Sequence, residues 1–331
     1  MRAAIIHGFG DVPRVEDFPE PVASDGQVVL DVVAAPLENV DRLQVSGRHY
    51  GSRAAYPGFP AVVGHSGVAR LDGRLIGFGG ALPPYGAFAE RTLVPSAYLA
   101  YFMDLPPDVD PALACAMPSS MLASLLPLTF GARLAAGETV LVQGATGFAG
   151  RIAVQIARRL GAGRVVGTGR DRSSLMALPS LGADAAVDLA QGDAALAEEL
   201  LAAAGPGGYD VILDFVWGHP TEVLLSTLVP EAAGFSDRPV RLVQIGEGAG
   251  PELSLRADAL RTSGVVLMGG ATGVRAAEVP ALAARCLAWI ASGEVVAEVE
   301  RVALDDVEAA WRGVTHGRRV VVMPDPTLGM V

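Results

Sequence analysis

The stretch VLVQGATGFAGRIAVQIARRLGAGRVVGTGRDR, residues 140–172, constrains the fold more than any other part of the chain. An apolar run at 140–142 is followed by glycines at positions 144, 147 and 150, by a pattern with helical period, and by a second apolar run at 165–166. A strand, a glycine-tight turn, a helix and a second strand within about thirty residues predict a βαβ unit.

The alternation of strand and helix continues after this unit. Apolar runs predict strands at 139–143, 164–168, 185–188, 209–214, 240–245 and 264–268. Helix-like segments lie between them at 151–160, 172–180, 193–204, 220–229 and 255–262. This pattern predicts an α/β fold with a parallel, doubly wound sheet.

The two ends of the chain have a different pattern of apolar runs and turn residues. Short β-type runs broken by Gly and Pro predict an antiparallel, barrel-like domain, with strands at 3–6, 27–33, 62–68, 74–78 and 88–94. A helix is expected at 111–133. Late in the chain, a helix near 276–292 precedes a strand at 295–302, a helix at 305–315 and a strand at 319–323 that could rejoin the first domain. We therefore expect one domain at 1–119 and 271–331, and a second domain at 120–270.

The glycines of GATGFAG suit a dinucleotide site. The first glycine permits a tight exit from the strand, the second lets the backbone approach a pyrophosphate, and the third lets the helix pack close to the sheet. The N-terminus of the helix offers unpaired N–H groups to the phosphates. The predicted contacts come from Gly144, Ala145, Thr146, Gly147, Phe148, Ala149 and Gly150.

The end of the second strand indicates which dinucleotide is bound. An NAD site would place Asp or Glu there to bind the ribose hydroxyls. This chain has Thr168 and Gly169, followed by RDRSS at 170–174. Two arginines and two hydroxyls favour the 2′-phosphate of NADPH, because arginine makes charge-assisted bonds to phosphate. Four residues of this turn are predicted to contact the cofactor: Gly169, Arg170, Arg172 and Ser173.

Composition excludes several classes of function. The net charge of −11 argues against a nucleic-acid partner, which would require a basic face. No lysine occurs, so mechanisms that need a lysine Schiff base or a phosphate-loop lysine are excluded. Cys115 and Cys286 are too few and too isolated for a disulfide framework or a zinc cluster, and we expect buried free thiols in a reducing cytoplasm.

Two stretches bear on targeting to membranes. The apolar run in MRAAIIHGFGD is too short for a signal peptide. The uncharged segment 111–132 approaches the length of a membrane span, but its interior contains Pro118 and Pro127, and Asp110-Pro111 is typical of a helix start. We expect a buried helix, no membrane partner and a cytoplasmic location.

Segments in order along nearly the whole chain resemble the medium-chain dehydrogenase/reductase superfamily, and within it the zinc-independent, quinone-oxidoreductase-like branch. They are AAPLENVDRLQVSGRHYG, FPAVVGHSGVAR, YGAFAERTLVP, LPPDVDPALACAMPSS, AAGETVLVQGATGFAG, YDVILDFVWG, RLVQIGEG and DDVEAAWRGVTHGRRVVVMP. The resemblance implies a Rossmann domain that binds NADPH, inserted into a GroES-like barrel domain that holds the substrate. It also implies cofactor contacts after the later strands, from Val216, Ile245, Gly246, Gly269 and Ala271.

The departures from the superfamily concern the reaction site. Zinc-dependent relatives carry metal ligands where this chain has Glu38, His65 and, approximately, Ser119, and the lobe that binds a structural zinc is missing. One histidine with one carboxylate falls below the ligand count of a stable zinc site, so we predict no metal and read His65 as a turn or core residue. The resemblance also implies Asn at position 38 and Thr at Leu122 in quinone reductases, both near the nicotinamide.

These observations predict hydride delivery from NADPH to a quinone, an enone or another α,β-unsaturated carbonyl, without zinc. The resemblance implies that Glu38, Tyr50 and Tyr56 lie near the reaction site. They are the predicted catalytic residues, and the proton could come from water or from either tyrosine. Two alternatives stay open, a non-catalytic NADPH-binding protein on the same fold and a zinc-type alcohol dehydrogenase. The apolar strand at 264–268 would form a sheet edge, so a homodimer is expected.

Overall fold

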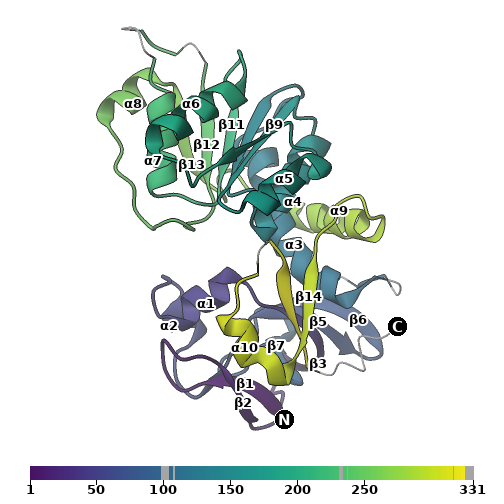
Figure 1. The fold of residues 1–331 in the computed structure, drawn as a ribbon. Coiled ribbons are helices and arrows are strands. Elements are labelled where there is room, and N and C mark those ends of the chain that lie inside the picture. The colour runs from purple at the N-terminus through teal and green to yellow at the C-terminus, as the bar shows by residue number, and fades with distance from the viewer. Residues whose placement is uncertain (98–103, 107–108, 231–233, 237, 316, 325–331) are drawn as a thin grey trace. The chain divides into compact units, whose positions relative to one another are not determined.

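A computed structural model describes residues 1–331 except 98–103, 107–108, 231–233, 237, 316 and 325–331 (Figure 1). The chain divides into two compact units. The N/C-terminal unit comprises Met1–Pro118 and Ala284–Val331, and the central unit comprises Ser119–Ala283. The boundaries expected from the sequence lie at 119/120 and 270/271.

The six strands of the central unit form one parallel sheet with the order β10-β9-β8-β11-β12-β13 (Figure 1). The strands are β8 (Thr139–Gln143), β9 (Arg164–Gly169), β10 (Ala185–Asp188), β11 (Val211–Asp214), β12 (Val240–Gln244) and β13 (Val265–Gly269). The helices between them are α4 (Phe148–Arg159), α5 (Arg172–Ala177), α6 (Asp193–Ala204), α7 (His219–Thr227) and α8 (Ala257–Thr262). The predicted α/β class with a doubly wound sheet is confirmed.

The order of the strands follows from right-handed crossovers. Helices α4 and α5 carry the chain outward from β8, α6 returns it to the centre, and α7 and α8 carry it outward on the other side. Leu196 and Leu200 of α6 and Leu224 of α7 share one core with the sheet. Ile152 and Ile156 of α4 are fully buried. Because helices cover both faces, the central strands read as unbroken apolar runs.

The N/C-terminal unit is built from two sheets (Figure 1). The first has the order β2-β1-β4, with β1 (Arg2–Ile6), β2 (Arg14–Asp17) and β4 (Ala61–Val62). The second has the order β14-β15-β3-β5-β6, with β7 paired to β3; its strands are β3 (Gln27–Pro36), β5 (Ser66–Leu71), β6 (Arg74–Gly79), β7 (Arg91–Pro95), β14 (Val299–Ala303) and β15 (Arg319–Met323). Since β15 pairs with β3, the expectation that the tail rejoins the first domain is confirmed.

The sequence did not predict every element of this unit. Strand β2 and the short helices α1 (Asn39–Val45) and α2 (Ser52–Ala55) were missed, whereas α9 (Val279–Ala291) and α10 (Val307–Arg312) were expected. The single strand predicted at 62–68 is wrong, because the chain turns at Gly64, where φ is +90°. A Cβ there would lie 2.8 Å from the ring of Phe88, so packing and backbone conformation both demand glycine.

Helix α3 (Pro111–Leu126) is the apolar segment that resembled a membrane span, and a π-helical turn continues it to Gly131. It is the one helix of the described residues that is long and apolar enough to cross a membrane, and 56% of its most apolar window is buried inside the protein. The Asp110 carboxylate accepts a hydrogen bond from the Ala112 N–H at 2.9 Å, as expected for a helix start. Burial of this kind is typical of a core helix.

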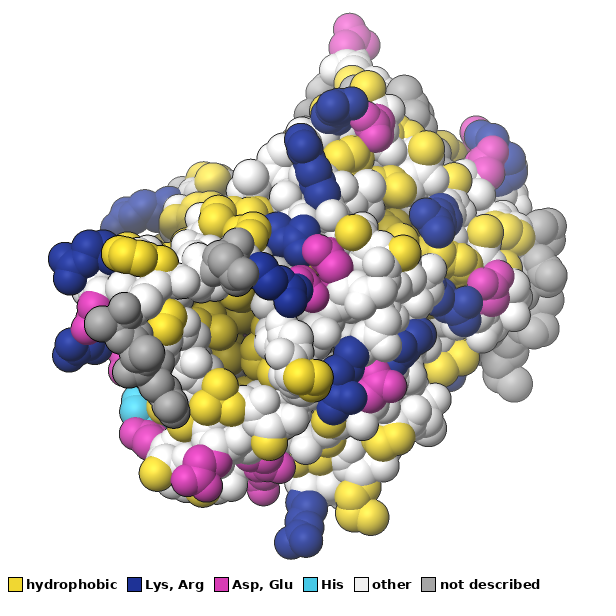
Figure 2. All heavy atoms as spheres, turned by 90° about the horizontal axis from the view of Figure 1, so that it is seen from above, with side chains coloured by type: hydrophobic (Ala, Val, Ile, Leu, Met, Phe, Trp, Pro, Cys, Tyr) yellow, Lys and Arg dark blue, Asp and Glu magenta, His cyan; other side chains and the backbone are white. Residues whose placement is uncertain are grey.

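Acidic and basic side chains are interspersed over the face of the molecule drawn in Figure 2. Many of the exposed arginines in the described ranges pair with a carboxylate, as Arg256 does with Asp258 and Arg275 with Glu278. Such pairs reduce the field that an isolated arginine would produce. The expectation of no nucleic-acid partner stays a prediction.

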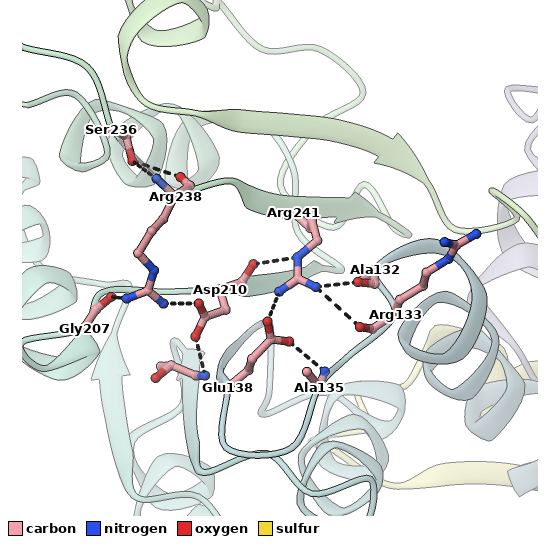
Figure 3. A network of polar contacts seen from close by, with 10 residues as sticks. Ala132, Arg133, Ala135, Glu138, Gly207, Asp210, Ser236, Arg238 and Arg241 are labelled. Atoms are coloured by element: carbon pink, nitrogen blue, oxygen red, sulfur yellow. Dashed lines mark hydrogen bonds and ion pairs between the residues drawn. The ribbon is translucent and has the colours of Figure 1, made fainter.

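Arg241 anchors the end of this helical segment to the central sheet (Figure 3). Its Nη1 donates to the carbonyl of Ala132 at 2.6 Å, and its Nη2 donates to Glu138 Oε1 at 2.6 Å. The Glu138 carboxylate also accepts from the Ala135 N–H at 2.8 Å. A cation at a helix C-terminus satisfies terminal carbonyls and complements the helix dipole.

We expect the substitution Arg241→Met to destabilise the central unit by about 2 kcal/mol, because it leaves the half-buried Glu138 carboxylate and the Ala132 carbonyl without this donor. Thermal unfolding should then occur roughly 4–8 °C lower. Arg256→Met, at a side chain that is 79% exposed, is the matched control and should change the midpoint by less than about 2 °C. Equal effects of the two variants would contradict the anchoring role.

Candidate cofactor and reaction sites

The turn between β8 and α4 has the geometry of a phosphate-binding loop. Gly144 has φ of +87°, which L side chains rarely adopt. A Cβ on Gly150 would lie 2.2 Å from the carbonyl oxygen of Gly144, so the first turn of α4 sits directly against the strand end. Gly147 is the N-cap of α4, and no side chain caps the helix there. The positive end of the helix dipole therefore lies at the carboxyl edge of the sheet.

The end of β9 is hydrogen-bonded to the turn between β8 and α4. The Gly144 N–H donates to Oγ1 of the fully buried Thr168 at 3.1 Å. A Cβ on Gly169 would lie 2.2 Å from Cγ2 of Thr146, so the threonine side chain fills the space beside that glycine. Arg170 is consequently the first residue beyond β9 whose side chain can extend outward.

The acidic residue of this segment is engaged in capping. Asp171 is the N-cap of α5, and its Oδ2 accepts from the Ser174 N–H at 2.8 Å and from the Ser173 hydroxyl at 2.7 Å. Arg170 and Arg172 are both exposed. Among the described residues, neither guanidinium has a hydrogen bond or an ion pair. The turn therefore presents two cations, while its carboxylate holds the helix.

The other predicted cofactor residues lie at the carboxyl ends of β11, β12 and β13: Val216, Ile245, Gly246, Gly269 and Ala271. The buried Asp214 carboxylate accepts from the Val216 N–H at 2.8 Å and fixes the exit from β11. The Asp214 carbonyl accepts from the N–H groups of Ile245 at 2.8 Å and Gly246 at 3.1 Å. In open α/β sheets, ligands bind outside this edge.

These features fit a dinucleotide in the central unit. A Cβ would clash at Gly144, Gly150 and Gly169. The helix N-terminus carries no side-chain cap, and the predicted residues share one edge of the sheet. The pyrophosphate would be held by the turn at 144–150, and the adenosine ribose by the turn after β9. Individual contacts to the cofactor stay predictions.

The predicted catalytic residues lie in different surroundings of the N/C-terminal unit. Glu38, 8% exposed, is the N-cap of α1 and forms a capping box with Asp41. Tyr56 belongs to the core, and burial together with the charge of Asp41 raises the pKa of its hydroxyl. Tyr50 is 98% exposed and packs its ring on His49, with 4.1 Å between the ring centroids. A catalytic role for any of the three stays a prediction.

The structure brings His65 into an ionic cluster with the first turn of α1. His65 Nδ1 lies 3.0 Å from Asp41 Oδ1, and His65 Nε2 lies 3.7 Å from Glu38 Oε2. The His65 side chain is 43% exposed, whereas Asp41 is 1% exposed. His65 does lie in a turn, but it is not a core residue. Sequence reasoning missed Asp41, although LENVD at 37–41 carries acids three apart, the spacing of a capping box.

The hydrogen bond that His65 donates to Asp41 has the largest effect on the pKa of His65. This bond, with the charges of Asp41 and Glu38, raises the pKa of His65 from 6.5 to about 9, although burial opposes the shift. The imidazole is therefore protonated at neutral pH. Since the pKa is raised in the folded state, the interaction stabilises the fold fully below pH 6.5, and the stabilisation is lost as the pH rises through about 9.

The donor set of this cluster does not fit a zinc ion. Asp41 already accepts from the Glu38 N–H at 2.7 Å and binds His65 through its other oxygen. Within the described ranges, no three His, Cys, Asp or Glu side chains are grouped to hold a metal. Both cysteines are buried free thiols, as expected. Zinc independence nevertheless stays a prediction.

Three comparisons with known proteins agree with this geometry. The family model for zinc-binding dehydrogenases matches residues 149–232. An NAD-dependent alcohol dehydrogenase of Sulfolobus acidocaldarius is 26% identical over 312 residues, which cover 83% of this chain and 86% of the relative. A probable NADPH-dependent quinone reductase of Emericella nidulans is 29% identical over 205 residues, 57% of this chain and 54% of the relative.

A solved structure matches almost the entire chain. The quinone oxidoreductase of Thermus thermophilus, also solved with NADPH, has a TM-score of 0.75 and 29% identity, and the match covers 98% of this chain and all of the other. Together with the glycine turn, these relatives support an oxidoreductase with a nicotinamide cofactor. These matches confirm the resemblance to the medium-chain dehydrogenase/reductase superfamily that was seen in the sequence.

Proposed function

We propose that this protein is an NADPH-dependent reductase of quinones, enones or other α,β-unsaturated carbonyls, and that it works without zinc. The turn after β9 carries the cofactor assignment: Arg170 and Arg172 are exposed there, and Asp171 is engaged as a helix cap. The names of the Emericella and Thermus relatives support the acceptor class. When bound, NADPH would supply a hydride to the acceptor.

The residues of the chain would bind and orient rather than polarise the acceptor through a metal. The turn at 144–150 would place the pyrophosphate at the N-terminus of α4, and Arg170 would bind the 2′-phosphate. Since the His65 cluster does not fit a zinc ion, the acceptor would need its own conjugation to be electrophilic.

Turnover with a panel of quinones and enones, measured with NADPH and with NADH, tests the proposal. We expect oxidation of NADPH with at least one acceptor, a preference for NADPH over NADH, and no loss of rate with EDTA. Tight NADPH binding without oxidation by any acceptor would instead identify a non-catalytic binding protein. Alcohol oxidation with NAD⁺ that EDTA abolishes and zinc restores would identify a zinc-type alcohol dehydrogenase, the activity named for the Sulfolobus relative.

We also propose a homodimer formed through β13. This strand ends the order of the central sheet, and its Val266 and Leu267 side chains are 45% and 37% exposed. An apolar sheet edge can pair with its two-fold mate, which closes the assembly.

Light scattering at micromolar concentration should give twice the chain mass of 34.0 kDa, and Val266→Lys with Leu267→Lys should give the monomer mass. Val22→Lys, at a side chain that is 80% exposed in the other unit, should remain dimeric. A monomeric wild type would refute the proposal.

A further inference from the structure

His65 stands out among the groups that the proposed function leaves unused. Nδ1 and Nε2 of its ring face the carboxylates of Asp41 and Glu38, respectively, yet the side chain remains 43% exposed. We propose that His65 is the proton donor for the reduced acceptor, and that Asp41 is its positioning residue. This inference rests on the proposed reductase function and deepens it, because the sequence left the proton donor open between water, Tyr50 and Tyr56.

The orientation of the ring is set by a carboxylate that is itself fixed. Asp41 Oδ2 accepts from the Glu38 N–H at 2.7 Å, and Asp41 Oδ1 lies 3.0 Å from His65 Nδ1. Because Asp41 is 1% exposed, it cannot turn away without losing both contacts in the interior. Nδ1 is thereby occupied, and Nε2 is the nitrogen that can serve a substrate.

The contact between Nε2 and Glu38 leaves the Nε2–H group able to donate to another acceptor. The separation of 3.7 Å from Glu38 Oε2 exceeds a normal hydrogen bond, so Nε2 is attracted by the carboxylate but not saturated by it. Glu38 also lies near the Arg319 guanidinium of β15: burial lowers the pKa of that arginine, and the charge of Glu38 partly offsets this effect. Glu38 is therefore shared between two cations.

The groups that face His65 keep it charged. Asp41 and Glu38 from the start of α1 stabilise the imidazolium, and they hold the pKa of His65 near 9. Tyr56, after α2, keeps its proton, since burial and the charge of Asp41 raise the pKa of its hydroxyl. At neutral pH His65 is therefore protonated, and its imidazolium is a far stronger acid than the buried Tyr56 hydroxyl.

The chemistry of conjugate reduction requires such a proton. Addition of a hydride to the β-carbon of an enone moves the electron pair of the C=C bond toward the carbonyl and leaves an enolate. The Nε2–H bond then breaks, a new C–H or O–H bond forms on the enolate, and the imidazole becomes neutral. The exposed ring regains its proton from water, so charge and protons balance over one cycle.

The pairing of His65 with Asp41 can be tested without cofactor or acceptor. NMR titration of the histidine rings should show His65 titrating near pH 9 in the wild type, and in Asp41→Asn the midpoint should fall toward 6.5. A His65 midpoint near 6.5 in the wild type would overturn the inference. Asparagine can still accept the Glu38 N–H bond, so this variant removes the charge and keeps the cap.

Kinetics with an enone then test the transfer. We expect His65→Gln to lower kcat by about 10²-fold, to abolish the fall in rate above pH 9 and to leave the NADPH Kd unchanged. His7→Gln, at an exposed histidine that pairs with Glu16 in the same unit, is the matched control and should retain the wild-type rate. Asp41→Asn should move the falling limb of the pH profile to lower pH, and circular dichroism verifies that each variant is folded.

The outcomes separate the two proposals. Wild-type kcat and pH profile in a folded His65→Gln would overturn the role of His65 and leave the reductase function standing. A wild type that reduces no acceptor in the panel would overturn the reductase function, and this inference with it.

Discussion

Gly150→Ala is expected to lower the stability of the central unit by about 3 kcal/mol and to abolish NADPH binding, because the new Cβ has no space. It would lie 2.2 Å from the Gly144 carbonyl oxygen and 2.7 Å from the Ala145 Cα, and both atoms belong to the backbone. Helix α4 must therefore move away from the strand end, which displaces the N–H groups that would meet the phosphates. Thermal unfolding should occur roughly 6–12 °C lower.

Gly147→Ala provides the matched comparison within the same turn. A Cβ at Gly147 would have the Gly144 carbonyl oxygen as its nearest neighbour, at an ordinary 3.5 Å, and its φ of −76° suits any residue. We expect this variant to unfold like the wild type but to bind NADPH at least about tenfold more weakly, since the methyl group would occupy the approach of the pyrophosphate. Isothermal titration and thermal melts would measure both effects. If Gly147→Ala kept full affinity, the pyrophosphate would not lie against this glycine.

Arg170→Ala is expected to weaken NADPH binding by roughly ten- to a hundredfold and to leave NADH nearly unchanged. Loss of a charge-assisted hydrogen bond costs about 1.5–3 kcal/mol, and only NADPH has a 2′-phosphate for the guanidinium to bind. Within the described residues, the Arg170 side chain has no intramolecular partner to lose, so the variant should fold and melt like the wild type. Binding of NADPH, NADH and 2′-phospho-AMP, measured by titration calorimetry, separates the phosphate contact from the rest of the cofactor.

Arg275→Ala controls for the change in net charge. This arginine is 74% exposed and pairs with Glu278, so its removal should alter NADPH affinity by less than about twofold. Equal weakening of NADPH and NADH in Arg170→Ala would mean that Arg170 only shapes the turn. A wild type that prefers NADH would overturn the assignment of the whole segment. Arg172→Ala should have a smaller effect in the same direction, because Arg172 is predicted only to assist.

The sequence alone determined the central unit. Its central strands lie buried between two layers of helices, so they appear as apolar runs, and the crossover helices between strands show a helical period. The roles of Gly144 and Gly150 could also be predicted from the sequence. Glycine is required at 144 by the positive φ and at 150 by the close contact with the backbone. These are local requirements, and a local pattern expresses them.

Only the tertiary structure decided what surrounds the predicted catalytic residues. Tyr50 and Tyr56 are six positions apart, yet one is exposed and the other is in the core, which depends on the sheets that cover Tyr56. The break at Gly64 arises because the ring of Phe88 packs over it from a distant segment. Because the strand breaks there, His65 lies within hydrogen-bond distance of Asp41. The two residues are brought together by two separate sheets and a helix, and no periodicity in the sequence predicts such a contact.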